Sequence, residues 1–163
     1  MKTAVYPGSF DPFTLGHMDL LLRSCALFDH VIVAILHNKR KDPFFTLQER
    51  EEMIRNSIEE AGIGNISFAY YDGLLIDFAR EKKVTAIVRG LRAVTDFEYE
   101  LQLASTNKQL EPQVETVFMM ASTQYAYLSA STVREIAYYG GDIRTMVPAV
   151  NVQRIMERLK RHE

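Results

Sequence analysis

Five short runs of apolar, largely β-branched residues alternate with segments of helical periodicity, and this alternation most constrains the fold. The runs predict strands over residues 3–6, 30–36, 65–71, 85–90 and 115–121. The segments between and after them predict helices over 17–28, 46–62, 74–83, 96–110, 129–141 and 148–161. Strand and helix in alternation are typical of an α/β protein. We therefore predict a five-stranded parallel sheet with helices on both faces and further helices at the C-terminus.

Several local signals mark where the predicted helices begin and end. Three Thr-x-x-Glu pairs match the capping box, in which each partner satisfies a free backbone N–H of the first turn. The pairs are Thr46 with Glu49, Thr95 with Glu98, and Thr132 with Glu135. Gly62 stands where a glycine commonly ends a helix. Because no repeat, low-complexity tract or long linker divides the 163 residues, we predict a single Rossmann-like domain over 1–163.

Composition excludes several classes of protein. A net charge of −2 argues against a protein that coats nucleic acid, because such proteins usually carry a basic excess. Cys25 is the only cysteine, so we expect no internal disulfide, and the histidines form no zinc-binding pattern with it. No run of about 20 apolar residues predicts a membrane span, and the N-terminus lacks a signal-peptide pattern. We expect a cytoplasmic protein without nucleic-acid or membrane partners.

The segments that follow the predicted strands are rich in cations and hydroxyls. Ligands of open parallel sheets bind outside the carboxyl ends of the strands. The sequence PGSFDPFTLGH follows the first strand, a basic run at 39–41 follows the second, and Arg89 and Arg92 lie at the end of the fourth. A Ser- and Thr-rich segment follows the fifth. Together these segments predict a pocket for phosphate groups.

His17 lies in the first turn of the helix that follows the first strand. Free N–H groups and the helix dipole favour an anion there, and an imidazole can donate a hydrogen bond to a phosphate oxygen. We expect Gly8 to let the chain turn sharply as it leaves the sheet, and Gly16 to allow close approach to the backbone. The segment matches neither a Walker A loop nor a GxGxxG fingerprint. The alternative is a helix-capping turn with an exposed histidine.

Two segments resemble signatures of the nucleotidylyltransferase superfamily. Residues 14–17, TLGH, are similar to its (T/H)xGH signature, and residues 129–135, SASTVRE, are similar to its second signature, ISSTxxR. More narrowly, YPGSFDP, NKRKDPFFTLQER and RGLRAVTDFEYELQLA resemble the bacterial phosphopantetheine adenylyltransferase family. The resemblance extends from residue 2 to about residue 150, with the elements in the same order. RGLRA followed by DFEYE is the feature that singles out this family within the superfamily.

The resemblance implies adenylyl transfer from ATP to 4′-phosphopantetheine. The 4′-phosphate attacks the α-phosphorus in line, pyrophosphate leaves, and dephospho-coenzyme A forms without a covalent enzyme intermediate. Mg²⁺ is the implied cofactor, held mainly by the phosphates rather than by protein ligands. Because the attacking phosphate is already ionised, the reaction needs no side-chain nucleophile or general base. It needs cations and N–H donors that stabilise charge on the transferring and leaving groups.

The same resemblance implies roles for individual residues. The residues implied in catalysis are His17 at the α-phosphate, Lys41 bridging the reacting phosphates, and Arg92 on the nucleotide phosphates. The residues implied in binding phosphopantetheine are Ser9, Lys41, Leu75 and Arg89. The residues implied in binding ATP are Ser9, Phe10, His17, Gly90, Leu91, Arg92, Glu100, Tyr125, Ala126, Tyr127, Leu128, Ser129, Ala130 and Ser131.

Three positions depart from the pattern of many relatives. Ala130 stands in place of a serine, Tyr125 in place of a tryptophan found in some members, and Ser9 in place of a threonine. Ser9 keeps the hydroxyl. At Ala130 a backbone N–H would have to do the work of the missing hydroxyl, so the departure concerns only the detail of triphosphate binding.

Structural roles are the alternative for several of these residues. A basic run such as the one containing Lys41 is usually a solvated loop. Glu100 could simply pair with a neighbour on a helix surface. We expect helix initiation, packing or subunit contacts as the roles of three residues near Glu100, namely Asp96, Glu98 and Tyr99.

Two other functions compete with the one that the resemblance implies. Another nucleotidylyltransferase, for example one with nicotinamide mononucleotide as acceptor, would share the two signatures but not RGLRAVTDFEYE. A non-catalytic ATP-binding module would not need cations at the reacting phosphates. The resemblance also implies a homohexamer and feedback by coenzyme A. The Tyr- and Met-rich C-terminal half would supply either an apolar interface or core.

Overall fold

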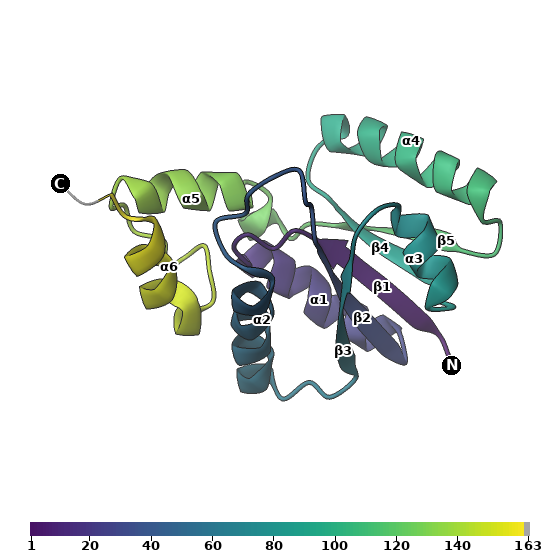
Figure 1. Cartoon of the computed structure of the whole chain (residues 1–163), viewed down its shortest axis with the longest axis horizontal. Coiled ribbons are helices and arrows are strands. Elements are labelled where there is room, and N and C mark those ends of the chain that lie inside the picture. The colour runs from purple at the N-terminus through teal and green to yellow at the C-terminus, as the bar shows by residue number, and fades with distance from the viewer. Residues whose placement is uncertain (162–163) are drawn as a thin grey trace.

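The structure is a computed structural model that describes residues 1–161, including every side chain among them except that of Val94. Five parallel strands form its central sheet in the order β3-β2-β1-β4-β5 (Figure 1). The strands are β1 (Thr3–Gly8), β2 (His30–Leu36), β3 (Ile66–Tyr71), β4 (Ala86–Leu91) and β5 (Glu115–Met120). The predicted five-stranded parallel sheet is therefore confirmed, with the bounds of β2 as predicted and β1 two residues longer.

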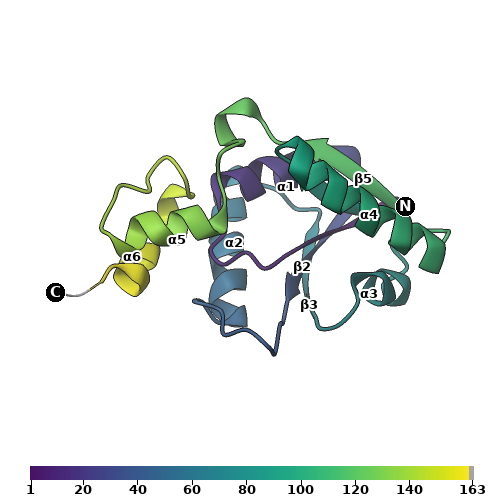
Figure 2. The ribbon, with the colours of Figure 1, turned by 90° about the horizontal axis from the view of Figure 1, so that it is seen from above.

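Helices cover both faces of the sheet, as predicted (Figures 1 and 2). The helices are α1 (Leu15–Leu27), α2 (Leu47–Ala61), α3 (Leu75–Glu81), α4 (Val94–Leu110), α5 (Ala130–Tyr138) and α6 (Val152–Leu159). Helices α1 and α2 pack on one face, and α3 and α4 on the other. Short 3₁₀ turns over Thr123–Tyr125 and Ala149–Asn151 precede α5 and α6. Among residues 1–161, no helix combines the length and apolar character needed to cross a bilayer.

The continuous apolar run of β2 reflects burial on both faces. Val33 and Ile35 join the core beneath α1 and α2, while Ile32 and Ala34 join the core beneath α3. Burying a valine- or isoleucine-sized side chain contributes about 1.5–3 kcal/mol, so a strand of this kind has no stable position at an exposed edge. This places β2 inside the sheet, next to β1.

A third apolar cluster attaches α5 and α6 to the side of α2. It contains Phe45, Met53, Val133 and Ile155, among other buried residues. The buried side chain of Asn151 adds two hydrogen bonds, to the Met53 carbonyl and to a serine hydroxyl of α2, both 3.0 Å long. The C-terminal helices therefore cover the same helix that borders the loop after β2.

One of the three predicted capping boxes is confirmed, and two are wrong. At α2, Thr46 Oγ1 accepts from the Glu49 N–H and the Glu49 carboxylate accepts from the Thr46 N–H. Gly62 ends that helix with a φ of 66°, as predicted. The same Thr-x-x-Glu pattern lies inside the other two helices rather than at their starts.

Helices α4 and α5 both begin earlier than their Thr-x-x-Glu patterns suggested. Thr95 lies within α4, which starts after Ala93 without a side-chain cap. The cap of α5 is Ser129, whose Oγ accepts a 3.1 Å hydrogen bond from the Thr132 N–H. The backbone N–H of Thr132 is therefore one of the groups that Ser129 caps, and Thr132 is not the capping residue of this helix. Ser129, three residues upstream, thus supplies the cap that the pattern had assigned to Thr132, but without the reciprocal bond of a capping box.

Gly8 is also used differently from the prediction. It ends β1, and the left-handed turn that follows lies at Phe10, with a φ of 49°. A Cβ on Gly8 would lie 2.9 Å from atoms of the Phe10 ring. Gly8 thus makes room for that ring rather than making the turn, and the buried ring helps to hold the unusual backbone of Phe10 in place.

Candidate active site

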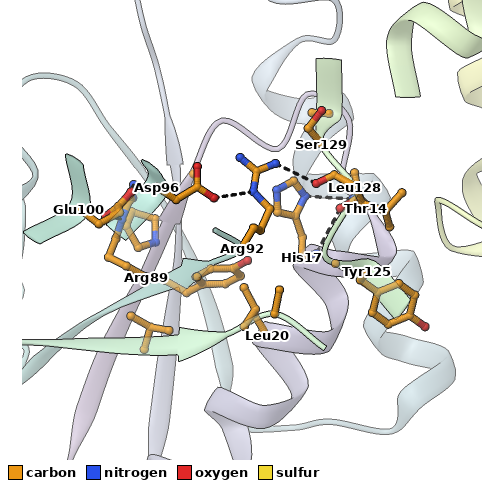
Figure 3. A pocket seen from close by; sticks show the side chains of 18 of the residues that line it. Thr14, His17, Leu20, Arg89, Arg92, Asp96, Glu100, Tyr125, Leu128 and Ser129 are labelled. Atoms are coloured by element: carbon orange, nitrogen blue, oxygen red, sulfur yellow. Dashed lines mark hydrogen bonds and ion pairs between the residues drawn. The ribbon is translucent and has the colours of Figure 1, made fainter. Parts of the chain in front are cut away.

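A cavity of about 500 Å³ lies at the carboxyl ends of β1 and β4. These two strands are neighbours, yet their following helices cover opposite faces of the sheet, so the strand order reverses between them. Open α/β sheets bind their ligands at such a reversal. The cavity is lined by Tyr6, Pro7, Gly8, Thr14, Gly16, His17, Leu20, Val88, Arg89, Gly90, Arg92, Thr95, Asp96, Tyr99, Glu100, Ala121, Tyr125, Leu128, Ser129 and Ala130 (Figure 3).

His17 is held in one orientation by the start of α1. Thr14 caps the helix, and its Oγ1 accepts a 3.2 Å hydrogen bond from the His17 N–H. In return, Nδ1 of His17 accepts a 3.0 Å hydrogen bond from the Thr14 N–H. An accepting Nδ1 carries no proton, so the proton of the neutral imidazole is on Nε2. Nε2 is therefore a hydrogen-bond donor in a ring that lines the cavity.

The surroundings of His17 keep its imidazole neutral. The ring stacks on Phe13 and meets the edge of Phe10, with centroid distances of 5.7 Å and 5.2 Å. This burial, with a smaller effect from the positive charge of Arg92, lowers the pKa of His17 from 6.5 to about 4. Figure 3 shows the Arg92 guanidinium beside the imidazole. At neutral pH the ring is thus an uncharged donor next to a permanent cation.

The low pKa of His17 predicts an acid-sensitive contribution to stability. Between pH about 4 and pH about 6.5, the unfolded chain binds more protons at this group than the folded protein does. The contribution is therefore complete above pH about 6.5 and is lost as the pH falls toward 4. Glutamine at position 17 would still accept from the Thr14 N–H but would not titrate.

The expected result is that His17→Gln loses less stability than the wild-type protein on acidification over this range. Urea unfolding of both proteins at about pH 7 and about pH 5 measures the difference. The same pH dependence in both proteins would contradict the assignment of this acid sensitivity to His17.

Two ion pairs fix the arginines of the cavity. Arg89 of β4 binds Glu100 of α4 through two hydrogen bonds, Nε to Oε2 at 2.7 Å and Nη2 to Oε1 at 2.6 Å. These hydrogen bonds raise the pKa of the Arg89 guanidinium. Arg92 binds Asp96 through Nε at 3.1 Å and donates through Nη1 to the Leu128 carbonyl at 2.9 Å. Each cation therefore has a fixed position and keeps further N–H groups for a ligand.

Of the four described α4 residues that line the cavity, sequence reasoning assigned only Glu100 to the site and missed Thr95, Asp96 and Tyr99. Asp96 and Tyr99 line the cavity together with Glu100, although helix initiation, packing or subunit contacts were their expected roles. The spacing 96, 99, 100 places all three on one side of a helix. Once Glu100 was a candidate, that periodicity was the signal that would have identified the other two.

A second cavity, of about 290 Å³, borders the first. Ala130 lines both, and the second also contains Ser9, Lys41, Arg50 and Arg134. Sequence reasoning missed Arg134 as a site residue. The available signal was that Arg134 is the arginine of the SASTVRE segment. Its Nη1 donates to the main-chain carbonyl of the loop residue Asp11 at 2.6 Å. Cations from the loop after β2, from α2 and from α5 therefore meet around this cavity.

The structure distributes the predicted site residues over three environments. The first cavity brings together His17, Arg89, Gly90, Arg92, Glu100, Tyr125, Leu128, Ser129 and Ala130. The second cavity is lined by Ser9, Lys41 and Ala130. The remaining predicted residues line neither cavity; they are Phe10, Leu75, Leu91, Ala126, Tyr127 and Ser131. Leu75 packs against the core beneath α3.

The acidic groups of the first cavity do not form a metal-binding cluster. Glu100 is paired with Arg89, and Asp96 is paired with Arg92. Throughout residues 1–161, no group of three His, Cys, Asp or Glu side chains is arranged to hold a metal ion. These side chains fit a site in which a bound ligand, rather than the protein, supplies most of the oxygen ligands of a divalent cation.

Comparison with known proteins places the chain in a family. The profile of the cytidylyltransferase-like family matches residues 5–136. A phosphopantetheine adenylyltransferase from Caldanaerobacter subterraneus subsp. tengcongensis is 48% identical over 161 residues, covering 99% of each chain. Its namesakes from Heliobacterium modesticaldum and Shouchella clausii are 51% and 53% identical, covering 97% and 91% of this chain and 93% and 92% of their own. The chain belongs to the phosphopantetheine adenylyltransferase family.

Membership in the phosphopantetheine adenylyltransferase family confirms the resemblance seen in RGLRAVTDFEYELQLA. Solved structures support the fold. Plasmodium falciparum nicotinic acid mononucleotide adenylyltransferase, complexed with NaAD, matches with a TM-score of 0.62 at 16% identity, over 96% of each chain. A bifunctional NMN adenylyltransferase/ADP ribose pyrophosphatase from Francisella tularensis matches with a TM-score of 0.71 at 17% identity, over 96% of this chain and 50% of its own. At these identities the likeness concerns the fold alone.

Proposed function

We propose that this protein is a phosphopantetheine adenylyltransferase whose reaction takes place at the junction of the two cavities. It transfers the adenylyl group of ATP to the 4′-phosphate of phosphopantetheine and releases pyrophosphate and dephospho-coenzyme A, a step of coenzyme A synthesis. The observation that carries the placement is the fixed Nε2 donor of His17 beside Arg92 at the reversal of strand order.

The reaction is a displacement at phosphorus. An oxygen of the 4′-phosphate forms a bond to the α-phosphorus of ATP, and the bond from the α-phosphorus to the α,β-bridging oxygen breaks. The electron pair of that bond leaves with pyrophosphate. The nucleophile is already ionised, so the protein contributes by orienting two anions and by stabilising the charge that develops between them.

The residues of the first cavity suit the nucleotide side of this reaction. His17 Nε2 donates to an oxygen of the α-phosphate, and Arg92 supplies a permanent positive charge next to it. The N-terminus of α5, capped by Ser129, presents free backbone N–H groups for the triphosphate. This role does not require a hydroxyl at position 130, so the alanine there is compatible with binding.

The second cavity suits the phosphate that attacks. Ser9 and Lys41 line it, and Ala130 connects it to the first cavity. Lys41 supplies a charge that neutralises both reacting phosphates as they approach. We propose Mg²⁺ as the cofactor, held mainly by the phosphates because Asp96 and Glu100 are engaged by arginines. When bound, the ion neutralises charge on the triphosphate.

The two competing functions are not favoured. An acceptor such as nicotinamide mononucleotide is suggested by the solved structures only, at 16–17% identity, whereas the relatives at 48–53% identity are named phosphopantetheine adenylyltransferases. A binding module without turnover would not need a neutral donor and a permanent cation side by side.

Pyrophosphate release from ATP and Mg²⁺ tests the proposal directly. The acceptors are 4′-phosphopantetheine, nicotinamide mononucleotide, glycerol 3-phosphate and none. We expect release with 4′-phosphopantetheine alone. Release with a different acceptor would overturn the choice of substrate but keep the mechanism. ATP binding without release under any condition would favour the non-catalytic module.

We further propose a cytoplasmic homohexamer. Exposed apolar side chains support assembly: Phe97, Tyr99 and Leu101 on α4 are each more than 40% exposed, as are Tyr138 and Tyr139 at the end of α5. Apolar side chains that gather into one contiguous exposed patch mark a site of contact with another molecule, and a second copy of this chain would cover them in the assembly. Sedimentation of the purified protein measures the oligomeric state. Feedback by coenzyme A stays a prediction from the resemblance.

A further inference from the structure

Arg50 of α2 is a buried cation whose hydrogen bonds all go to main-chain carbonyls. The residue is 2% exposed and lies at the inner wall of the second cavity. Its Nη1 donates to the carbonyls of Ser9, at 2.7 Å, and Leu36, at 3.0 Å. Its Nε donates to the carbonyl of Phe45 at 3.1 Å and more weakly to that of Thr46 at 3.4 Å. Among residues 1–161 no carboxylate forms an ion pair with it.

Burying a charge without an opposite charge in an ion pair with it is costly, so the main-chain hydrogen bonds of Arg50 have to offset that cost. Burial lowers the pKa of the Arg50 guanidinium, while the negative charge of Asp11 opposes that effect. Removing this side chain would leave the buried carbonyls that accept from it without their hydrogen bonds. Here three separate segments depend on it: the loop after β1, the end of β2 and the start of α2.

These three segments carry the groups that face the second cavity. Ser9 is itself a wall residue, and Leu36 immediately precedes the loop that contains Lys41. Asp11 completes the arrangement at the other end of this loop, because its carboxylate accepts from the N–H groups of Phe44 and Phe45 at 3.0 Å and 2.9 Å. The Lys41 loop is residues 37–46, between β2 and α2, and the Ser9 loop is residues 9–14, between β1 and α1. Arg50 and Asp11 together fix both ends of the Lys41 loop to the Ser9 loop.

We infer that Arg50 is a positioning residue that keeps Ser9 and the Lys41 loop aligned across the second cavity, so that both contact the reacting phosphates at once. The inference rests on the proposed function. It predicts a loss in the chemical step rather than in nucleotide binding, because Arg50 does not line the first cavity. A misplacement of about 1 Å in such a site lowers the rate by roughly 100-fold.

The test compares Arg50→Met, Arg50→Lys and Arg55→Met with the wild-type protein. Arg55 is the matched control: it lies on the same helix, is half-exposed and pairs with Glu51 at 2.6 Å. Two quantities are measured on proteins that circular dichroism shows to be folded. They are kcat for pyrophosphate release with saturating ATP, Mg²⁺ and 4′-phosphopantetheine, and the dissociation constant for ATP from calorimetry.

We expect kcat to fall about 100-fold in Arg50→Met and about 10-fold in Arg50→Lys, which keeps the charge but not the planar fork. The dissociation constant for ATP should stay within about 3-fold in both, and Arg55→Met should match the wild type in both quantities. If Arg50→Met does not fold, Arg50→Lys decides. A wild-type kcat in the Arg50 variants, or equal losses in kcat and ATP affinity, would overturn the inference alone. A wild-type protein without turnover would overturn the proposed function and this inference with it.

Discussion

Replacing His17 by alanine is expected to lower kcat by about 10²–10³-fold while the dissociation constant for ATP changes little. The expectation follows from the geometry of the start of α1, where Thr14 fixes Nδ1 as an acceptor and leaves Nε2 as the donor. A donor already aimed at the developing charge needs no reorganisation during the reaction, and losing one such donor costs about this factor. Initial rates of pyrophosphate release, with calorimetry for ATP binding, measure both quantities.

Two further variants separate catalysis from folding in this prediction. His17→Gln keeps an acceptor for the Thr14 N–H, so α1 should stay capped while kcat still falls. His30→Ala removes an imidazole that contacts Ser67 at the opposite end of its strand from the cavity. It should leave kcat unchanged. Near-normal turnover in His17→Ala, or an equal loss in His30→Ala, would refute the assigned role.

Most of the fold could be predicted from the sequence because burial leaves a strong pattern. The run in β2 is apolar at every position after His30, which only a strand covered on both faces requires. Helix starts were less predictable, because Thr-x-x-Glu also occurs inside helices. In α4 the Asp96 side chain pairs with Arg92, and the helix begins before Thr95 without any side-chain cap.

The candidate site could be predicted in part, because the carboxyl ends of parallel strands lie at one edge of the sheet. His17 and Arg92 follow two adjacent strands and Arg89 lies near the carboxyl end of one of them, and one cavity collects all three. The division into two cavities was not predictable, because it depends on how the loop after β2 packs against α5. Arg50 was not predictable either. It lies in the polar run QEREE, typical of a solvated face, and its burial depends on carbonyls from segments far apart in sequence.

Replacing Lys41 by alanine is expected to lower kcat/KM for 4′-phosphopantetheine by about 100-fold and to weaken ATP binding much less. Lys41 lines the second cavity on an exposed loop, so its ammonium is available to the attacking phosphate and to the phosphate under attack. Loss of one fixed cation at the reacting groups has about this effect. Steady-state rates with each substrate varied in turn, together with calorimetry for ATP, give the comparison.

The same loop supplies the matched control. Lys39 lies two residues away and carries the same charge, but its Nζ is 2.6 Å from Asp72 Oδ2 and it does not line the second cavity. Lys39→Ala should therefore stay within about 3-fold of the wild type, since exposed ion pairs contribute little. Equal losses in the two variants would mean that the net charge of the loop attracts anions from a distance. In that case the loss in kcat/KM relative to the wild type would shrink with added salt in both variants. A specific contact at Lys41 would instead keep the loss in Lys41→Ala larger than the loss in Lys39→Ala at high ionic strength.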